Sequence, residues 1–373
     1  MPLPGIMPGS PTGIFFNRIN AGNSPDSDWQ RRQNEGIEMS GNYKILSPSD
    51  LEDVTDEKRS FALDVLVGLS EIPKRLSSRY FYDDRGSKLF QKIMELPEYY
   101  LTNCEFEILN TQMEIIGDLV KAHYFNLIEL GAGDGRKTSI LINHFLIKKY
   151  KFKYVPIDIS EGAMKILTRN MNEKFPKLKC EGIVAEYFNG LKWLNKLDGG
   201  RNIVLFLGSN LGNFNKPQSR VFLRNLWNTL NDGDYLITGF DLKKDIDLMR
   251  RAYNDKKGMT REFNLNLLLR INRELGANFD LEKFHHYSNY DVFTGAMESY
   301  LVSREKQTVF IRELGQTFNF EPWEPIHTEY SYKYLESDIM ELAEATGYAI
   351  VQQLYDSKHY FVDSVWRVHK IEM

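Results

Sequence analysis

The 373-residue sequence is short of cysteine, of basic charge and of long apolar stretches. Its two cysteines, Cys104 and Cys180, form no Cys-x-x-Cys pair. This argues against a zinc site or a disulfide scaffold and suits a reducing cytoplasm. The formal net charge of −4 offers no basic excess for a nucleic-acid backbone. No apolar run approaches the ~20 residues that span a bilayer, so we expect no membrane segment.

The remaining composition is that of a globular enzyme, with 42% hydrophobic and 26% charged residues. The length allows one main domain with a sizeable insert. Residues 1–42 are rich in Gly, Pro, Ser and Asn, and we expect a disordered extension there. A start assigned too far upstream is the alternative, because Met39 opens a sensible N-terminus. The first ten residues lack the charged and apolar parts of a signal peptide.

A glycine-rich turn at residues 131–135 organises the chain. The apolar run 125–130 stops at Gly131, Gly133 and Gly135, and a helical pattern begins at Lys137. This order predicts a buried strand, a tight turn and a helix. Glycine reaches positive φ and lets a ligand approach the backbone, and the amides of the helix start then face that ligand.

Three kinds of cofactor use such a turn. A phosphate-binding P-loop and a dinucleotide turn each need a glycine at the position that Arg136 occupies. The turn Glu129-Leu-Gly-Ala-Gly133 fits the third kind, S-adenosylmethionine, without a mismatch. A glycine turn without any ligand is the simpler alternative at this point.

The next strand supports a cofactor with a ribose. Asp158 lies near the end of the apolar run 153–159, about 20–30 residues after the glycines, where an acid accepts hydrogen bonds from ribose hydroxyls. The alternative is that Asp158 only caps the helix expected at 160–171. The glycine turn and Asp158 occur together at the spacing that such a cofactor needs, which favours the cofactor over a helix cap.

The order of elements predicts an α/β fold. Strands expected at 202–207 and 234–240 alternate with helices, which implies a mostly parallel, doubly wound sheet with ligands at the strand carboxyl ends. A helix at 337–347 and a C-terminal hairpin at 348–355 and 360–369 follow. The expected strand ends carry these polar residues: Glu129, Asp158, Asn210, Asn213 and Asp241.

Residues 326–334 have two chemically different faces if the segment is extended. One face would carry His327, Glu329, Ser331 and Lys333, and the other Thr328, Tyr330 and Tyr332. On this pattern alone, a half-buried edge strand with a wet polar face is the favoured interpretation.

Taken together, the motifs resemble the histidine-specific N-alpha-methyltransferase family, which forms hercynine for ergothioneine biosynthesis. The similarity covers residues 43–373. Its most specific pieces are Tyr80-Phe-Tyr82, Gly86-Ser-Lys-Leu-Phe90, Leu96-Pro-Glu-Tyr-Tyr100, Glu129-Leu-Gly-Ala-Gly133, Phe206-Leu-Gly-Ser-Asn-Leu-Gly-Asn-Phe214, Ala252-Tyr-Asn254, Glu262-Phe-Asn264, Asn272-Arg-Glu274 and Thr328-Glu-Tyr-Ser331.

The resemblance implies a Rossmann-like class I methyltransferase domain with the C-terminal antiparallel hairpin, at 108–243 and 334–373. It also implies a discontinuous α+β substrate-binding domain at 58–107 and 244–333. The implied activity is N-methylation of the α-amino group of L-histidine with S-adenosylmethionine as cofactor. We expect a cytoplasmic monomer that acts on a small molecule, with no nucleic-acid partner.

The resemblance also implies roles for individual residues. The cofactor would be bound by Gly131, Gly133, Lys137, Asp158, Glu186 and Tyr187. The last two would flank the adenine, although the family usually has Asp and Phe there. The amino and carboxylate ends of the substrate would be held by Tyr99, Asn213 and Tyr253, and its imidazole by Glu329 and Ser331. Tyr82 and Phe90 would line the pocket, and Ser299 stands where well-known members have a methionine on the substrate ring.

Two points stay open at this level. No residue stands out as a dedicated general base for the amine. Tyr82 is a candidate beside a water chain and simple loss of the proton to solvent, and Asn213 is the second candidate catalytic residue. Ser299 leaves room for another aromatic amino acid of the tryptophan type, and a non-catalytic S-adenosylmethionine-binding protein is a third alternative.

Overall fold

The computed structural model describes residues 43–45, 57–120, 124–187, 189–190 and 200–370. The extension expected at residues 1–42, and Met39 within it, lie outside the described residues. All of these described residues belong to one compact unit, so the two sheets and the pocket can be described relative to one another. None of the helices in the described ranges is long and apolar enough to cross a membrane.

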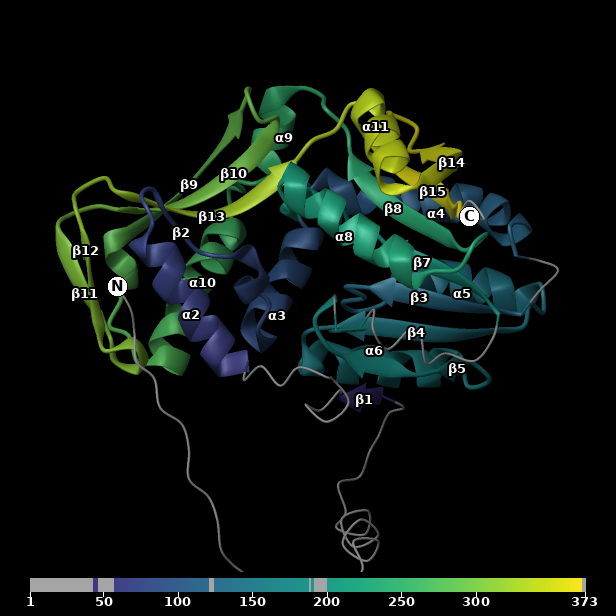
Figure 1. The fold of residues 1–373 in the computed structure, drawn as a ribbon, viewed down its shortest axis with the longest axis horizontal. Coiled ribbons are helices and arrows are strands. Elements are labelled where there is room, and N and C mark those ends of the chain that lie inside the picture. Colours follow the sequence, from purple (N-terminus) through teal and green to yellow (C-terminus); the bar gives the residue numbers. More distant parts are fainter. Residues whose placement is uncertain (1–42, 46–56, 121–123, 188, 191–199, 371–373) are drawn as a thin grey trace, which may run out of the picture. The chain divides into compact units, whose positions relative to one another are not determined.

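Within the described residues, nine strands form the central sheet, with the order β1-β6-β4-β3-β7-β8-β15-β14 and β5 beside β4 (Figure 1). Its strands are β1 (Tyr43–Ile45), β3 (Phe125–Leu130), β4 (Phe152–Asp158), β5 (Lys179–Cys180), β6 (Gly182–Val184), β7 (Arg201–Phe206), β8 (Tyr235–Asp241), β14 (Tyr348–Tyr355) and β15 (Phe361–Val368). Neighbours pair in parallel up to β8, whereas β15 is antiparallel to both β8 and β14. The predicted doubly wound sheet and C-terminal hairpin are confirmed.

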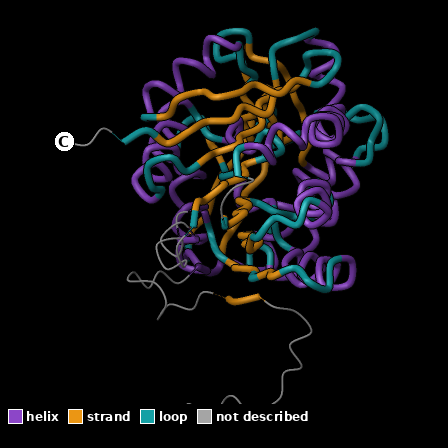
Figure 2. The backbone as a smooth tube through the Cα atoms, turned by 90° about the vertical axis from the view of Figure 1, so that its right-hand side faces the viewer, coloured by secondary structure: helices purple, strands orange, loops and turns teal. Residues whose placement is uncertain are grey.

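Helices cover both faces of this sheet (Figure 2). Side chains of β3 alternate between two apolar clusters: Leu127 joins the helices of one face and Ile128 those of the other. The first face is covered by α4 (Tyr100–Asp118), α5 (Thr138–Ile147) and α6 (Glu161–Lys174), and the second by α8 (Lys216–Thr229) and α11 (Glu336–Thr346). The sheet is therefore buried between two helical layers.

A second sheet in the described residues has the order β2-β13-β10-β9. Its strands are β2 (Lys74–Arg75), β9 (Phe284–Asp291), β10 (Ala296–Ser303) and β13 (Pro325–Tyr332), and a separate hairpin is made of β11 (Gln307–Ile311) and β12 (Gln316–Phe320). The helices on this side are α2 (Glu57–Ser70), α3 (Asp84–Met94), α9 (Ile246–Ala252) and α10 (Met259–Leu275). Short 3-10 turns are η2 (Ser78–Phe81), η3 (Asn210–Asn213), η4 (Leu281–Lys283) and η5 (Arg312–Leu314).

Local sequence signals place several of these boundaries. Asn215 and Gln218 form a reciprocal capping box at the start of α8, with Pro217 at its first turn as predicted. Ser160 accepts from the amide of Ala163 and caps α6. Gly347 ends α11 in the left-handed region at φ 93°. Asp158 is therefore not the cap of α6, and its carboxylate is available for other contacts.

The strand β13 differs from its prediction in two ways. It is not an edge strand, because β10 and β2 pair with it on either side. A bulge falls at Thr328, since Ser299 pairs with Glu329 while the next residue, Tyr300, pairs with His327. One extra residue reverses the side-chain alternation, so His327 leaves the Glu329 face and packs against Tyr330 on the opposite face.

Beyond β13 the chain joins the two sheets. Tyr334 forms a bridge with Leu242 at the end of β8, and its amide donates to the carbonyl of Asp241 at 3.0 Å. The 3-10 turn η3, which follows β7, lies directly against β13, because a Cβ built on Gly212 would be 3.0 Å from the carbonyl oxygen of Tyr332. This contact brings the polar face of β13 to the carboxyl edge of the central sheet.

Candidate active site

The glycine turn after β3 forms an open cradle. Gly131 and Gly133 have φ of 73° and 55°, where other residues are strained. A Cβ at Gly133 would meet nothing within 4 Å, so this backbone is open to a ligand. The amide of Gly133 donates to one oxygen of Asp158 at 2.9 Å, and the amide of Ser160 donates to the other at 2.9 Å. Asp158 thus ties the turns after β3 and β4 and keeps free lone pairs for a diol.

Of the two residues predicted to flank the adenine, Tyr187 lies beside this cradle. The Tyr187 hydroxyl would be 2.6 Å from a Cβ on Gly131, and its ring packs edge-on against Phe206 with centroids 5.4 Å apart. Glu186 is half-buried and forms an ion pair with Arg79 at 3.0 Å. Tyr187 is therefore near the turn, and the contact of either side chain with an adenine stays a prediction.

The ammonium of Lys137 lies beside the turn after β7, 3.3 Å from a Cβ built on Gly208. It pairs with the buried carboxylate of Glu105 from α4. The second oxygen of Glu105 accepts from the amide of Gly208 at 2.7 Å, in the turn after β7. The pair of Lys137 and Glu105 therefore links the start of α5 to α4. A direct contact of Lys137 with the cofactor stays a prediction.

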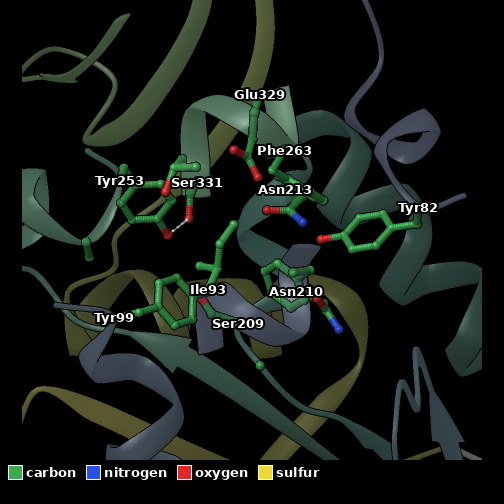
Figure 3. Close-up of a pocket in the computed structure, with 14 residues that line it drawn as sticks. Tyr82, Ile93, Tyr99, Ser209, Asn210, Asn213, Tyr253, Phe263, Glu329 and Ser331 are labelled. Atoms are coloured by element: carbon green, nitrogen blue, oxygen red, sulfur yellow. Dashed lines mark hydrogen bonds between the residues drawn. The ribbon is translucent and has the colours of Figure 1, made fainter. Parts of the chain in front are cut away.

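A pocket lies at the carboxyl edge of the sheet (Figure 3). Seven predicted site residues line it: Tyr82, Phe90, Tyr99, Asn213, Tyr253, Glu329 and Ser331. Ser299 does not line it; this side chain is buried behind Glu329, with the hydroxyl donating to the carboxylate at 3.4 Å. Asn210 joins the pocket to the cradle, because its amide nitrogen would be 3.1 Å from a Cβ on Gly131.

The remaining lining residues were not predicted as site residues: Ile93, Gly208, Ser209, Asn210, Ala252, Thr260 and Phe263. Asn210 had been recognised only as polar at a strand end. Ile93 lies on α3 one turn after Phe90, a spacing that indicates a shared helix face. Phe263 lies in a buried helix, where an aromatic residue gives no signal that separates core from pocket.

Aromatic rings form one wall. Tyr82, Phe90 and Phe263 contact one another with centroids 5.5 to 5.7 Å apart, and Phe90 also meets Tyr99 at 6.0 Å. Burial raises the pKa of Tyr82 well above its usual value, and the nearby Glu329 carboxylate adds to this. The hydroxyl therefore stays protonated at neutral pH, which counts against Tyr82 as a proton acceptor.

Glu329 is the acid of the pocket and points into its centre, toward Asn213 (Figure 3). Burial raises its pKa from 4.5 to about 7, while Lys333 and the Ser299 hydroxyl act in the opposite direction. A carboxylate held at this pKa is poorly satisfied by the protein alone. It is therefore a ready acceptor for an N–H donor of a ligand.

Ser331 lies two residues further along the same face. Its hydroxyl is 2.7 Å from the hydroxyl of Tyr253, and Lys333 donates to both, at 2.9 and 2.8 Å. The Lys333 ammonium also forms an ion pair with Asp241 at 2.8 Å, with both side chains fully buried. The predicted shared face of Glu329, Ser331 and Lys333 is confirmed.

The glycine cradle, the carboxylate of Asp158 and the adjoining pocket lie together at one edge of the central sheet. A family model described as histidine-specific methyltransferase, SAM-dependent, matches residues 61–368. The chain belongs to this family. The predicted resemblance is confirmed, and S-adenosylmethionine is the cofactor of this methyltransferase.

Three relatives show the range of this family. Histidine N-alpha-methyltransferase of Mycolicibacterium smegmatis is 35% identical over 76% of this chain and 87% of that protein. Ergothioneine biosynthesis protein 1 of Schizosaccharomyces pombe is 29% identical over 82% of this chain and 41% of that protein. L-tryptophan methyltransferase of Psilocybe serbica is 26% identical over 76% of this chain and 86% of that protein.

The methyltransferase pocket holds no cluster of metal ligands. Among the described residues no group of three or more His, Cys, Asp or Glu side chains is placed to hold a metal ion.

Proposed function

We propose that this methyltransferase transfers methyl groups from S-adenosylmethionine to the α-amino group of L-histidine, up to the trimethylated betaine hercynine of ergothioneine biosynthesis. The observation that carries the proposal is the placement of Glu329 and Ser331 side by side in a pocket shared with Asn213. The family match and the similarity to a histidine N-alpha-methyltransferase support it.

The pair suits an imidazole ring. Neutral imidazole has one N–H donor and one acceptor nitrogen, and the charged ring has two donors. Glu329 accepts a hydrogen bond from such a donor, and the hydroxyl of Ser331 serves as the partner of the second nitrogen. An indole has a single donor and no acceptor nitrogen, so its ring could pair with only one of these two side chains. Asn213 and Tyr253 then fall to the amino and carboxylate ends.

The residues around the cradle fit the methyl donor. Gly131, Gly133 and Asp158 would hold its amino-acid end and ribose, with Glu186 and Tyr187 at the adenine and Lys137 behind the turn.

When bound, the sulfonium supplies an electrophilic methyl group. The chain's own part is to exclude water and to hold a neutral amine in line. Asn213 can bind that amine without fixing it as an ammonium. The rings of Tyr82, Phe90 and Tyr99 attract the cationic product.

The domain assignment is also a proposal. Residues 58–107 and 244–333 would form the substrate-binding domain, and residues 108–243 and 334–373 the cofactor-binding domain. The separate sheets of the two regions support this division. We further propose that the enzyme acts as a monomer on a small molecule in the cytoplasm, where its two buried thiols stay reduced.

A paired binding experiment tests the proposal. Glu329→Ala removes a charge-assisted hydrogen bond worth about 2–3 kcal/mol, so histidine should bind about 30- to 150-fold more weakly. The affinity for S-adenosylhomocysteine, measured by titration calorimetry on the same protein, should change less than about twofold. Equal losses for both ligands, or no loss for histidine, would contradict the proposal.

A second substrate class has its own support. Ser299 is small and polar where the resemblance implies a methionine on the substrate ring, and one relative is an L-tryptophan methyltransferase. The alternative predicts tighter binding of tryptophan-type amino acids than of histidine. Competition between the two amino acids for the wild-type enzyme separates the two proposals.

A further inference from the structure

The pocket lacks a positive charge of its own. None of its fourteen described lining residues is a lysine or an arginine, and Glu329 is its only acidic side chain. An α-amino acid substrate brings a carboxylate into this space. Burying a carboxylate beside Glu329 is costly unless hydrogen bonds or an opposite charge compensate it.

A buried cation lies directly behind the lining. The Lys333 ammonium is inaccessible to solvent, 2.8 Å from the Tyr253 hydroxyl and 2.9 Å from the Ser331 hydroxyl. Both hydroxyls line the pocket, and they are 2.7 Å from each other. The positive charge is thus one hydrogen bond away from the ligand space.

Lys333, Tyr253 and Ser331 form a triangle of mutual hydrogen bonds, and their hydrogens exceed the acceptors within it. The three N–H donors of Lys333 are directed to Tyr253, Ser331 and Asp241. The two hydroxyls have two hydrogens, and one of these is used in the bond between them. One O–H therefore remains to donate into the pocket, from a hydroxyl that an ammonium polarises.

The charged groups behind the pocket carry a net positive charge, opposite in sign to a substrate carboxylate. Asp241 contacts two ammoniums, those of Lys333 and Lys244, and also accepts from the Tyr100 hydroxyl at 2.8 Å. Although burial opposes it, the two ammoniums hold the pKa of Asp241 below its usual value. With both lysines protonated, the cluster has one positive charge in surplus, which the carboxylate of a bound amino acid would balance.

We propose that Lys333 is a positioning residue that selects α-amino acids. Its ammonium polarises the linked hydroxyls of Tyr253 and Ser331, so that the O–H left over on Tyr253 donates to the substrate carboxylate while Ser331 faces the ring. This rests on the proposed function only in requiring an amino acid substrate, and it applies to any side chain on that amino acid.

The variant Lys333→Met tests this selection. It leaves Asp241 paired with Lys244 and Tyr100, so no buried charge loses all its partners. The ligands are histidine and histidinol, which share the ring and the amine but differ in the carboxylate. Their dissociation constants are measured by calorimetry in the presence of S-adenosylhomocysteine.

The wild type should prefer histidine. In Lys333→Met the affinity for histidine should fall about 10- to 100-fold, with less than about a threefold change for histidinol, so that the preference collapses. Equal losses for both ligands would assign Lys333 a purely structural role. An unchanged preference would also overturn the proposal.

Two further variants keep the test decisive. Lys244→Met is the matched control, because it removes the same formal charge from Asp241 without touching either hydroxyl; the preference for histidine should fall much less than in Lys333→Met, and an equal fall would overturn the specific role of Lys333. If Lys333→Met does not fold, Tyr253→Phe removes one arm of the triangle and should lower the preference by itself. If the wild type binds tryptophan instead, the proposed substrate is wrong, and tryptophan with tryptophanol gives the same comparison. A wild type that prefers no acid over its alcohol overturns the inference.

Discussion

At the scale of single residues, Glu329 combines a cost to the fold with a use in binding. Its carboxyl group is held at a pKa of about 7 because burial disfavours the charged form. The Ser299 hydroxyl donates to the carboxylate only at a long distance of 3.4 Å, and Ser331 lies on the same face of the strand. The carboxylate therefore lacks a strong donor. A ligand N–H supplies what the protein does not.

The stability of Glu329→Gln should depend on pH. The folded protein holds the carboxyl proton up to about pH 7, whereas the unfolded chain loses it near pH 4.5. Ionisation therefore destabilises the wild type increasingly as the pH rises from about 4.5 to 7. The variant has no such penalty, so it should be more stable than wild type by about 1–3 kcal/mol at pH 8 and differ little at pH 4.5. Thermal unfolding of the ligand-free proteins measures this, and a gain independent of pH would contradict it.

At the scale of secondary-structure elements, we expect the glycine cradle to bind the cofactor and the neighbouring helices to stabilise the fold. The turn after β3 presents open backbone at Gly133, and the pair of Lys137 and Glu105 fixes the neighbouring helices. One substitution in each separates binding from folding.

Gly133→Ala should impair the cofactor more than the fold. At φ 55° the alanine costs about 1 kcal/mol, and its Cβ projects into the open cradle. We expect S-adenosylhomocysteine to bind at least about tenfold more weakly. Gly315→Ala is the matched control, with φ 59° and equally open space but at the β11–β12 hairpin. It should lose similar stability and no affinity; equal affinities for the two variants would refute an open cradle.

Lys137→Met should mainly lower the free energy of unfolding. It strands the buried carboxylate of Glu105, and removing one partner of a buried pair costs about 3–5 kcal/mol. Lys148→Met removes an exposed pair with Glu114 near the end of α5 and should cost less than about 1 kcal/mol. Chemical denaturation compares them. A Lys137→Met protein of wild-type stability that no longer binds S-adenosylhomocysteine would show that Lys137 serves the cofactor directly.

At the scale of the whole molecule, the sequence predicts the central sheet well. The buried runs at β3, β7 and β8, the helix start at Pro217 and the helix end at Gly347 are local signals, and the structure follows them.

The rest depends on contacts between distant segments. The bulge at Thr328 moves His327 to the other face, and it is stabilised by a hydrogen bond from Thr328 to Asn264 of α10, at 2.8 Å. The direction of Lys137 is set by Glu105, which is 32 positions earlier in the chain. Lys333 gains its role only when β13 meets Asp241 at the end of β8. No periodicity within one segment encodes such pairings.

The most direct test of the account is a product analysis of the purified full-length protein. It is incubated with S-adenosylmethionine and an equimolar mixture of the free aromatic amino acids, and every product is identified by mass. The account predicts that histidine gains up to three methyl groups and that the other amino acids stay unmodified. Methylation of tryptophan with histidine untouched, or cofactor binding without any methylated product, would contradict it.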